Sequence, residues 1–160
     1  HFQSREDLMI YKENSILMLA LELRFEIEDI PTVASEAITG KSNDKGLDLV
    51  YIDTNSRIAV IAQGYLAENI EKQQAPANKS SSLNTAVAWI LSRDLSDIPT
   101  ELQPVARSLR TALEAGQITT LEFWYVHNLP QSKNVAEELR SVEHTAQNAL
   151  MEERFRVSMI

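Results

Sequence analysis

Two apolar segments separated by a short polar turn constrain the fold of this chain more than any other feature. Leu47–Asp53 and Ile58–Tyr65 are rich in Val, Ile and Tyr, and only polar residues fill Thr54–Arg57 between them. This pattern predicts a β-hairpin. Both faces of both strands are mostly apolar, which is typical of central strands covered on each side. The chain is therefore expected to build a sheet with helices around it.

Each strand of this hairpin carries one polar side chain in apolar surroundings, Asp48 on the first and Gln63 on the second. If Thr54–Arg57 form the turn, Asp53 pairs with Ile58, and counting back along both strands pairs Asp48 with Gln63. Residues directly opposite each other on antiparallel strands share a face, with Cβ atoms about 5 Å apart. The hairpin thus predicts a carboxylate beside an amide at one end of the sheet. A shift of one residue in register would separate them, so the prediction depends on the turn.

The remaining segments alternate between helical and strand patterns within a single domain, residues 1–160. The predicted helices are Arg5–Glu28 and those beginning near Leu83, Leu102 and Ser132. The other predicted strands are Thr119–Val126 and Ser35–Thr39, the latter either a strand or a frayed end. The polar segment Glu68–Ser82 is predicted to be a loop, with Lys72–Ser82 its most flexible part. The order α-β-β-β-α-α-β-α describes an α/β fold with a central mixed sheet of about four strands flanked by helices.

Composition excludes several classes of protein. The chain has no cysteine, which excludes disulfides and thiolate metal sites and fits a reducing cytoplasm. It has no apolar run of about 18 residues, so no membrane-spanning helix is expected. The net charge of −8 argues against a free-standing DNA-binding domain, although a local basic strip or a basic partner domain is compatible with it. Because the chain begins at His1 and stops at Ile160, we interpret it as the N-terminal fragment of a longer protein.

The familiar ligand-binding motifs are missing from the sequence. Its three histidines lack the spacing of a zinc site, and its four glycines fit no dinucleotide or Walker pattern. His127 and Asn128 directly follow the last predicted strand. They are expected to anchor the turn before Pro130, with a proton carrier or metal ligand as the alternative role.

Four segments carry a resemblance to a known family: NDKGLDLVYID, IAVIAQGY, NKSSSLNTAVAWIL, and YVHNLPQS with the following NVAEELRSVE. They resemble the N-terminal region of the abortive-infection phage-resistance (AIPR) family, which is similar in layout to the PD-(D/E)XK nuclease core of restriction endonucleases and Mrr-like enzymes. The resemblance covers most of the chain. It implies a restriction-endonuclease-like core, a bacterial cytoplasmic protein of phage defence, and Mg²⁺- or Mn²⁺-dependent cleavage of DNA or RNA. It also implies a C-terminal region of the same protein as a partner.

The resemblance also assigns site residues. In that fold an acid on the second strand binds the metal, a Glu or Gln on the third strand lies beside it, and a Lys two residues later activates water or stabilises the phosphate. Asp48 matches the first position and Gln63 the second, with the carbonyl of Gly64 as a further metal ligand. The third position is Tyr65, whose phenol, with a pKa near 10, is a poor base at neutral pH. Lys79 is the candidate for the missing lysine.

The first helix often supplies a further acid in that fold, and Glu22 and Glu26 are the candidates. Each residue also has a structural interpretation: Asp48 satisfies backbone groups at a strand start, Gln63 is a buried amide, and the two glutamates lie on one exposed helix face. Two hypotheses therefore stand. One is a Mg²⁺-dependent nuclease, favoured by the paired polar residues on core strands. The other is a non-catalytic module that recognises nucleic acid or protein, favoured by the missing Lys and the acidic charge.

Overall fold

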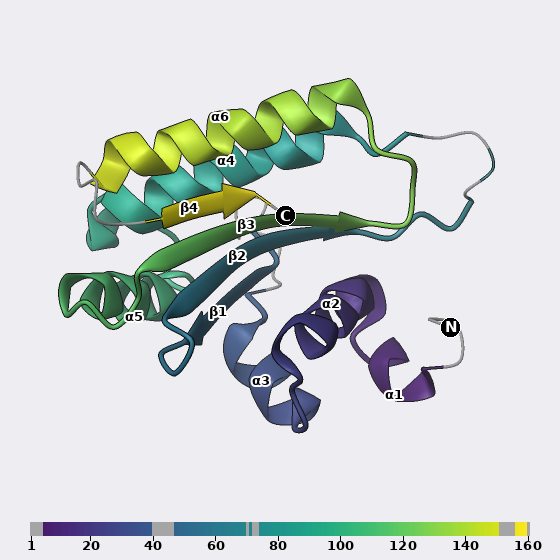
Figure 1. The fold of residues 1–160 in the computed structure, drawn as a ribbon, viewed down its shortest axis with the longest axis horizontal. Helices are drawn as coiled ribbons and strands as arrows, with labels where there is room; N and C mark the ends of the chain where they lie inside the picture. Colours follow the sequence, from purple (N-terminus) through teal and green to yellow (C-terminus); the bar gives the residue numbers. More distant parts are fainter. Residues whose placement is uncertain (1–4, 40–46, 70, 72–73, 151–155, 160) are drawn as a thin grey trace.

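A mixed β-sheet lies between two layers of helices (Figure 1). The structure, a computed structural model, describes residues 5–39, 47–69, 71, 74–150 and 156–159. The sheet has the order β1–β2–β3–β4, formed by Leu49–Asp53, Ile58–Tyr65, Thr120–His127 and Arg156–Met159. β1 and β2 are antiparallel, whereas β3 runs parallel to β2 and β4 runs parallel to β3. The prediction of an α/β fold with a mixed sheet between helices is therefore confirmed.

The β1–β2 hairpin has the register that the turn predicts. Asp53 pairs with Ile58 and Val50 pairs with Ile61. The turn is closed by the Asp53 carboxylate, whose Oδ1 accepts hydrogen bonds from the backbone N–H groups of Asn55 (3.0 Å) and Ser56 (3.2 Å). Because this turn is stabilised by residues within the hairpin, local sequence was sufficient to predict the register.

Side chains of the sheet alternate between two apolar cores. One core faces α4 (Ala77–Ser92), α5 (Gln103–Glu114) and α6 (Lys133–Leu150) and contains Val50, Ile61, Phe123 and Tyr125. The other faces α1 (Glu6–Met9), α2 (Ser15–Phe25) and α3 (Ile30–Ala37) and contains Leu49, Val60, Ala62 and Trp124. Both faces of the central strands are thus buried, as the apolar pattern predicts. We refer to the two helical groups as the α4–α6 layer and the α1–α3 layer.

The first predicted helix is divided into three pieces. α1 spans Glu6–Met9, a 3₁₀ turn spans Lys12–Asn14, and α2 spans Ser15–Phe25. Lys12 has φ of 51°, which is incompatible with a continuous right-handed helix. α2 ends at Glu26, which is also left-handed, with φ of 53°. The apolar residues were read correctly as helical, but the interruption at Lys12 has no Gly or Pro to mark it.

The segment predicted as the first strand belongs to a helix. α3 spans Ile30–Ala37, with the Asp29 side chain accepting a hydrogen bond from Thr32 N–H at 3.2 Å and Pro31 in the first turn. Asp at the N-cap followed by Pro is a helix start signal, because the cap satisfies a free N–H and proline needs none there. The strand-like contacts of the predicted segment are an isolated antiparallel bridge between Ile38 and Leu49 and a hydrogen bond from Thr39 N–H to the Asp48 carbonyl at 3.0 Å. The prediction of a strand over Ser35–Thr39 is therefore wrong.

The polar segment ahead of Leu83 is also helical. α4 spans Ala77–Ser92, so it begins six residues before Leu83 and includes Lys79. Ser80 and Ser82 donate their hydroxyls to the carbonyls of Ala77 (2.8 Å) and Asn78 (2.9 Å), one turn earlier. A serine whose hydroxyl donates to a carbonyl of the preceding turn can be accommodated within a helix. The prediction that Lys79 lies in a loop is therefore wrong.

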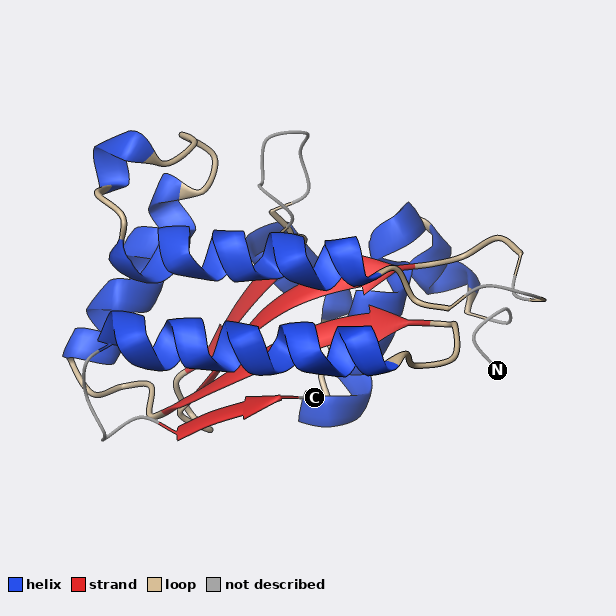
Figure 2. Cartoon of the chain, turned by 90° about the horizontal axis from the view of Figure 1, so that it is seen from above, coloured by secondary structure: helices blue, strands red, loops and turns tan. Residues whose placement is uncertain are grey.

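The remaining elements follow the predicted order. α5 spans Gln103–Glu114 and stops at Gly116, whose φ of 68° suits glycine. α6 spans Lys133–Leu150 and crosses the sheet beside α4 (Figure 2). A 3₁₀ turn, Leu95–Asp97, connects α4 and α5. β4 was not predicted by the sequence analysis. None of the described helices combines the length and the apolar character needed to cross a membrane.

Ser132 caps α6, and its replacement tests that assignment. Its hydroxyl accepts a hydrogen bond from Val135 N–H at 3.2 Å. Ser132→Ala is expected to lower the free energy of unfolding by about 1 kcal/mol, because the N–H of the first turn loses its partner. Urea unfolding followed by circular dichroism measures this loss. The control is the exposed Ser96→Ala, expected to change stability by less than about 0.5 kcal/mol. Equal effects of the two changes would contradict the cap.

Candidate functional site

Asp48 lies immediately before β1 and bonds to residues on both sides of Gln63. Its backbone N–H donates to the carbonyl of Ala62 at 3.1 Å. Its carboxylate Oδ2 accepts a hydrogen bond from the backbone N–H of Gly64 at 2.8 Å. The structure therefore places Asp48 beside the two neighbours of Gln63 on β2, but the predicted pairing of Asp48 with Gln63 is not formed, because the ladder ends at Leu49 and Ala62.

The geometry at Asp48 is less regular than a simple continuation of the ladder. The strand pairing ends at Leu49 and Ala62. Leu47 and Leu49 lie two residues apart, yet Leu47 packs in the core of the α4–α6 layer and Leu49 in that of the α1–α3 layer. A regular strand would place both on one face. The Asp48 side chain thus accepts the hydrogen bond from Gly64 N–H that a backbone carbonyl would accept in a regular ladder. This agrees with the structural interpretation of Asp48, and it also fixes the carboxylate beside Gly64.

Gln63 is 2% exposed, and strand alternation places it on the same face as Ile61, which packs in the core of the α4–α6 layer. On its other side it pairs with Tyr125 of β3. The Tyr125 hydroxyl donates to the carbonyl of Pro76, which caps α4, at 3.1 Å. Burial, with a smaller contribution from neighbouring Tyr65, raises the pKa of Tyr125. Its phenol is therefore a protonated donor at neutral pH, and it holds the start of α4 against this end of the sheet.

Lys79 lies in the first turn of α4. Its backbone N–H donates to the same Pro76 carbonyl at 3.3 Å, and the residue is half-buried. The contacts from Gln63 through Tyr125 to Pro76 place the start of α4, and Lys79 with it, at the end of the sheet where Asp48 lies. The side chains or backbones of Asp48, Gln63 and Lys79 each also form a polar or electrostatic interaction besides the hydrogen bonds given above. Lys79, the candidate for the missing lysine, therefore lies on a helix that adjoins the candidate site.

Tyr65 and His127 form the last pair of the β2–β3 ladder. His127 Nδ1 accepts a hydrogen bond from Leu129 N–H at 3.3 Å. The Asn128 side chain accepts from Ala67 N–H at 2.8 Å and donates to the Ala67 carbonyl at 2.9 Å. The prediction that His127 and Asn128 anchor a turn is confirmed. The Asn128 bonds connect the segment that follows β3 to the segment that follows β2.

Glu22 and Glu26 are not brought to this cluster. α2, which carries Glu22, packs on the opposite face of the sheet, in the α1–α3 layer, and Glu26 is its C-terminal cap. Glu22 forms an ion pair with Arg5 at 2.7 Å, and Glu26 is exposed. Their predicted accessory role therefore lacks support from the arrangement of the helices.

Sequence reasoning missed two features of β3, the strand that pairs with β2. Tyr125 connects Gln63 to α4, and only the parallel pairing of β2 and β3 reveals this. Glu122 is 3% exposed within the same strand. Its carboxylate accepts from Arg24 at 2.9 Å and from the Trp124 indole at 3.1 Å. The signal for Glu122 was visible, because a single acid in the apolar run TLEFWYV needs a buried partner.

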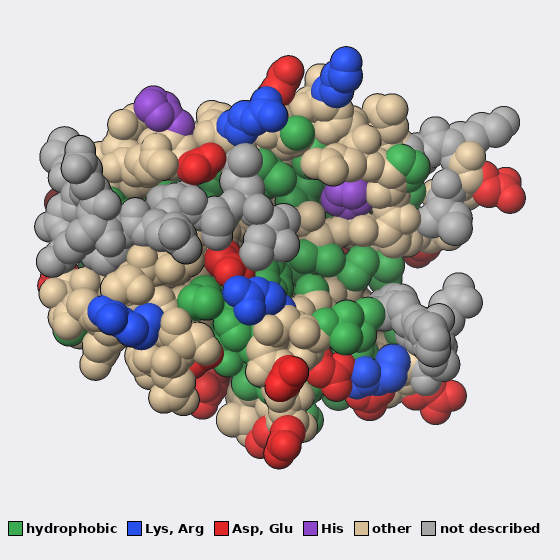
Figure 3. Space-filling view, viewed as in Figure 1, with side chains coloured by type: hydrophobic (Ala, Val, Ile, Leu, Met, Phe, Trp, Pro, Cys, Tyr) green, Lys and Arg blue, Asp and Glu red, His purple; other side chains and the backbone are tan. Residues whose placement is uncertain are grey.

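On one face of the molecule, the described basic side chains do not gather into a strip that would suit nucleic acid. On the face shown in Figure 3, Lys and Arg side chains are scattered among Asp and Glu instead of forming one basic strip. Across the described part of the chain, no group of three or more His, Cys, Asp or Glu could hold a metal ion. A site made of Asp48, the Gln63 amide oxygen and the Gly64 carbonyl would contain one carboxylate and two neutral oxygen donors.

Comparisons with protein-family models, with curated proteins and with solved structures found no match for this chain. The likeness of the four segments quoted above therefore stays an expectation. What the domain does has to be argued from the arrangement of Asp48, Gln63, Gly64 and Lys79.

Proposed function

We propose that this domain is a metal-dependent nuclease that cleaves phosphodiesters of DNA or RNA. Cleavage would take place at the end of the sheet where Asp48 and Gln63 lie. The observation that carries the proposal is the 2.8 Å hydrogen bond from Gly64 N–H to the Asp48 carboxylate. It fixes an acid beside the backbone of the residue that follows Gln63. In this proposal the protein acts in phage defence in the bacterial cytoplasm, together with a C-terminal region of the same protein.

The fold assigned by the proposal is a restriction-endonuclease-like core. The antiparallel bridge between Ile38 and Leu49 supports it, because a strand preceding β1 would pair at this edge. The β1–β2 hairpin and the parallel β3 reached through α4 and α5 also support it. Under this reading α3 has replaced most of the first strand, and Ile38 retains the bridge to Leu49.

The residues present fit Mg²⁺ or Mn²⁺ by their donor chemistry. Asp48 offers a carboxylate, Gln63 an amide oxygen and Gly64 a carbonyl, and Mg²⁺ is commonly held by one or two carboxylates together with water and phosphate oxygens. When bound there, the ion would supply Lewis-acid activation of water and stabilisation of the charge that develops on the phosphate.

The chain's own residues have separate roles in this proposal. The Gly64 N–H orients the Asp48 carboxylate. Tyr125 holds the start of α4 through Pro76, which keeps the Lys79 ammonium near the site to attract a phosphate oxygen. Tyr65 contributes a hydroxyl donor and not a base. A cation that stabilises transferring phosphate is a large contribution in such reactions.

A second function is favoured by one observation: Asp48 is the single acid among the proposed site residues. Without a second carboxylate and with Tyr65 where the family has Lys, the same fold would serve as a degenerate module that recognises nucleic acid or protein. The hydrogen bond of Asp48 would then be purely structural. The two functions differ in whether the Asp48 charge is needed for metal binding and cleavage.

The test is cleavage of plasmid DNA and structured RNA with Mn²⁺, comparing the wild type with Asp48→Asn. Asparagine keeps an acceptor for Gly64 N–H and removes the charge, so the fold is expected to persist while cleavage falls at least about a hundredfold. Lys79→Ala is expected to reduce cleavage as well. Calorimetric titration with MnCl₂ measures whether binding is lost in Asp48→Asn.

Asp97→Asn provides the matched control, because Asp97 is exposed on the 3₁₀ turn after α4. It should cleave like the wild type. Nuclease activity that is equal in Asp48→Asn and in the wild type would reject the assignment. Absence of both cleavage and Mn²⁺ binding in the folded wild type would favour the recognition module.

A further inference from the structure

Among the residues that the structure describes, the outer edge of the sheet at β1 is unpaired over most of its length. β1 is the terminal strand of the sheet and pairs with β2 on one side only. In the described part of the chain, its other side is paired at Leu49 alone, by Ile38. Exposed edges are templates for pairing with another chain, and proteins usually protect them with Lys, Pro or a bulge. The sequence LVYID of β1 contains neither Lys nor Pro.

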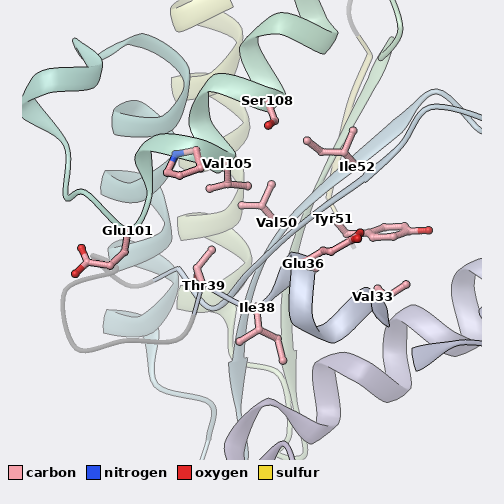
Figure 4. A pocket seen from close by; sticks show the side chains of 12 residues that line it. Val33, Glu36, Ile38, Thr39, Val50, Tyr51, Ile52, Glu101, Val105 and Ser108 are labelled. Atoms are coloured by element: carbon pink, nitrogen blue, oxygen red, sulfur yellow. The ribbon is translucent and has the colours of Figure 1, made fainter. Parts of the chain in front are cut away.

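A cavity of about 560 Å³ lies along this edge. Val50 and Ile52 line it on the side of α5, together with Val105 and Ser108 (Figure 4). Because side chains alternate along a strand, Tyr51 lies on the other side of the edge, toward α3. The cavity therefore follows the strand edge itself, with one helix on each side, and does not lie on one face of the sheet.

Both sides of this cavity carry an acid. Glu36 lies on the α3 side and Glu101 on the α5 side, and both are exposed. Neither forms an ion pair within the described residues, and no described Lys or Arg lines the cavity. An apolar cavity between two acids is complementary to a ligand that is apolar in the middle and basic on both sides. A second copy of this chain would instead oppose acid to acid.

We propose that the β1 edge binds an extended, basic peptide segment of another protein by strand addition. The segment pairs with the backbone of β1 over about four residues, roughly 13 Å. Alternate side chains then point to opposite sides of the edge, so apolar residues fill the space beside Val50 and Val105 while Lys or Arg reaches Glu36 or Glu101. Backbone pairing gives affinity in this mode, and the pockets on each side give specificity.

The test begins with selection of peptides from a displayed library of random 12-mers against the full chain. Enriched peptides are expected to combine alternate apolar residues with Lys or Arg. Their fluorescein-labelled forms are then titrated by fluorescence anisotropy. The double change Glu36→Lys with Glu101→Lys is expected to weaken binding about tenfold or more, since two attractions become repulsions. Ser108→Trp, which fills the cavity from an exposed position, is expected to weaken binding to a similar degree.

The matched control is Glu28→Lys with Glu114→Lys, two exposed acids outside the cavity whose replacement changes the net charge equally. Hydrogen exchange supplies a second readout, because β1 amides should exchange more slowly in the complex. Failure to enrich any peptide overturns the proposal. Equal weakening by both charge reversals, or protection of amides elsewhere without β1, also overturns it.

Discussion

Phe123→Ala is expected to lower the free energy of unfolding by about 3–5 kcal/mol, the usual cost of deleting a buried aromatic side chain. Phe123 is 0% exposed and pairs with Ile61 on the neighbouring strand. It lies beneath the α4–α6 layer, so its removal leaves a cavity that neither strand nor helix can close alone. A loss of this size is a large fraction of the stability of a typical domain, about 5–15 kcal/mol.

Chemical denaturation in urea measures this loss, with Leu23→Ala as the control. Leu23 lies on α2 and is 74% exposed, so the same kind of truncation should cost less than about 0.5 kcal/mol. A comparable loss in the two variants would show that Phe123 does not occupy the core. An unchanged slope of the urea transition would confirm that only stability has changed.

Removing the positive partner of Glu122 is expected to have the second largest effect on stability. Arg24 contacts the Glu122 carboxylate at 2.9 Å, and the side chains are 44% and 5% exposed, respectively. Arg24→Met keeps the apolar stem and leaves Glu122 with the Trp124 indole alone. A fully buried pair costs about 3–5 kcal/mol to break this way. Because Arg24 is nearly half exposed, about 2 kcal/mol is expected, measured by the same urea transitions.

The double change Arg24→Met with Glu122→Gln separates charge burial from packing. Glutamine can still accept from the Trp124 indole, so the double variant should recover much of the stability lost by Arg24→Met. Arg107→Met, an exposed arginine on α5, is the control and should be nearly neutral. If the double variant is as unstable as Arg24→Met, the loss comes from the packing of the arginine stem and not from an unpaired acid.

The parts of the fold that were predictable from sequence are those determined by nearby residues. The β1–β2 register follows from a turn stabilised by Asp53, and α6 begins where Ser132 caps it. The predictions failed where two local signals compete. The sequence of Ser35–Thr39 suggests a strand or a frayed end, although Asp29 and Pro31 begin a helix that includes most of it, and the serines of α4 suggest a loop, although their hydroxyls donate to carbonyls of the helix.

The candidate site divides in the same way. Asp48 and Gln63 were predicted to be neighbours because both lie on one hairpin. Their detailed geometry was not predicted, since the ladder ends at Leu49 and the Asp48 carboxylate takes over the next bond. Tyr125 was not recognised because its contact with Pro76 joins segments far apart in the sequence. Such contacts depend on tertiary packing, which periodicity does not describe.

The connection between the strands has a consequence for the order in which the protein folds. β1 and β2 are joined by a short turn, whereas β3 reaches β2 only after α4 and α5. Closing a longer loop costs more entropy, so the hairpin is expected to form before the parallel pairing. The bond between Asp48 and Gly64 therefore belongs to the early hairpin, and the contact that brings α4 to it belongs to the later docking of β3. In a chain arrested between these stages, Asp48 and Gln63 would already belong to a formed hairpin, whereas Lys79 would not yet have been brought to this end of the sheet.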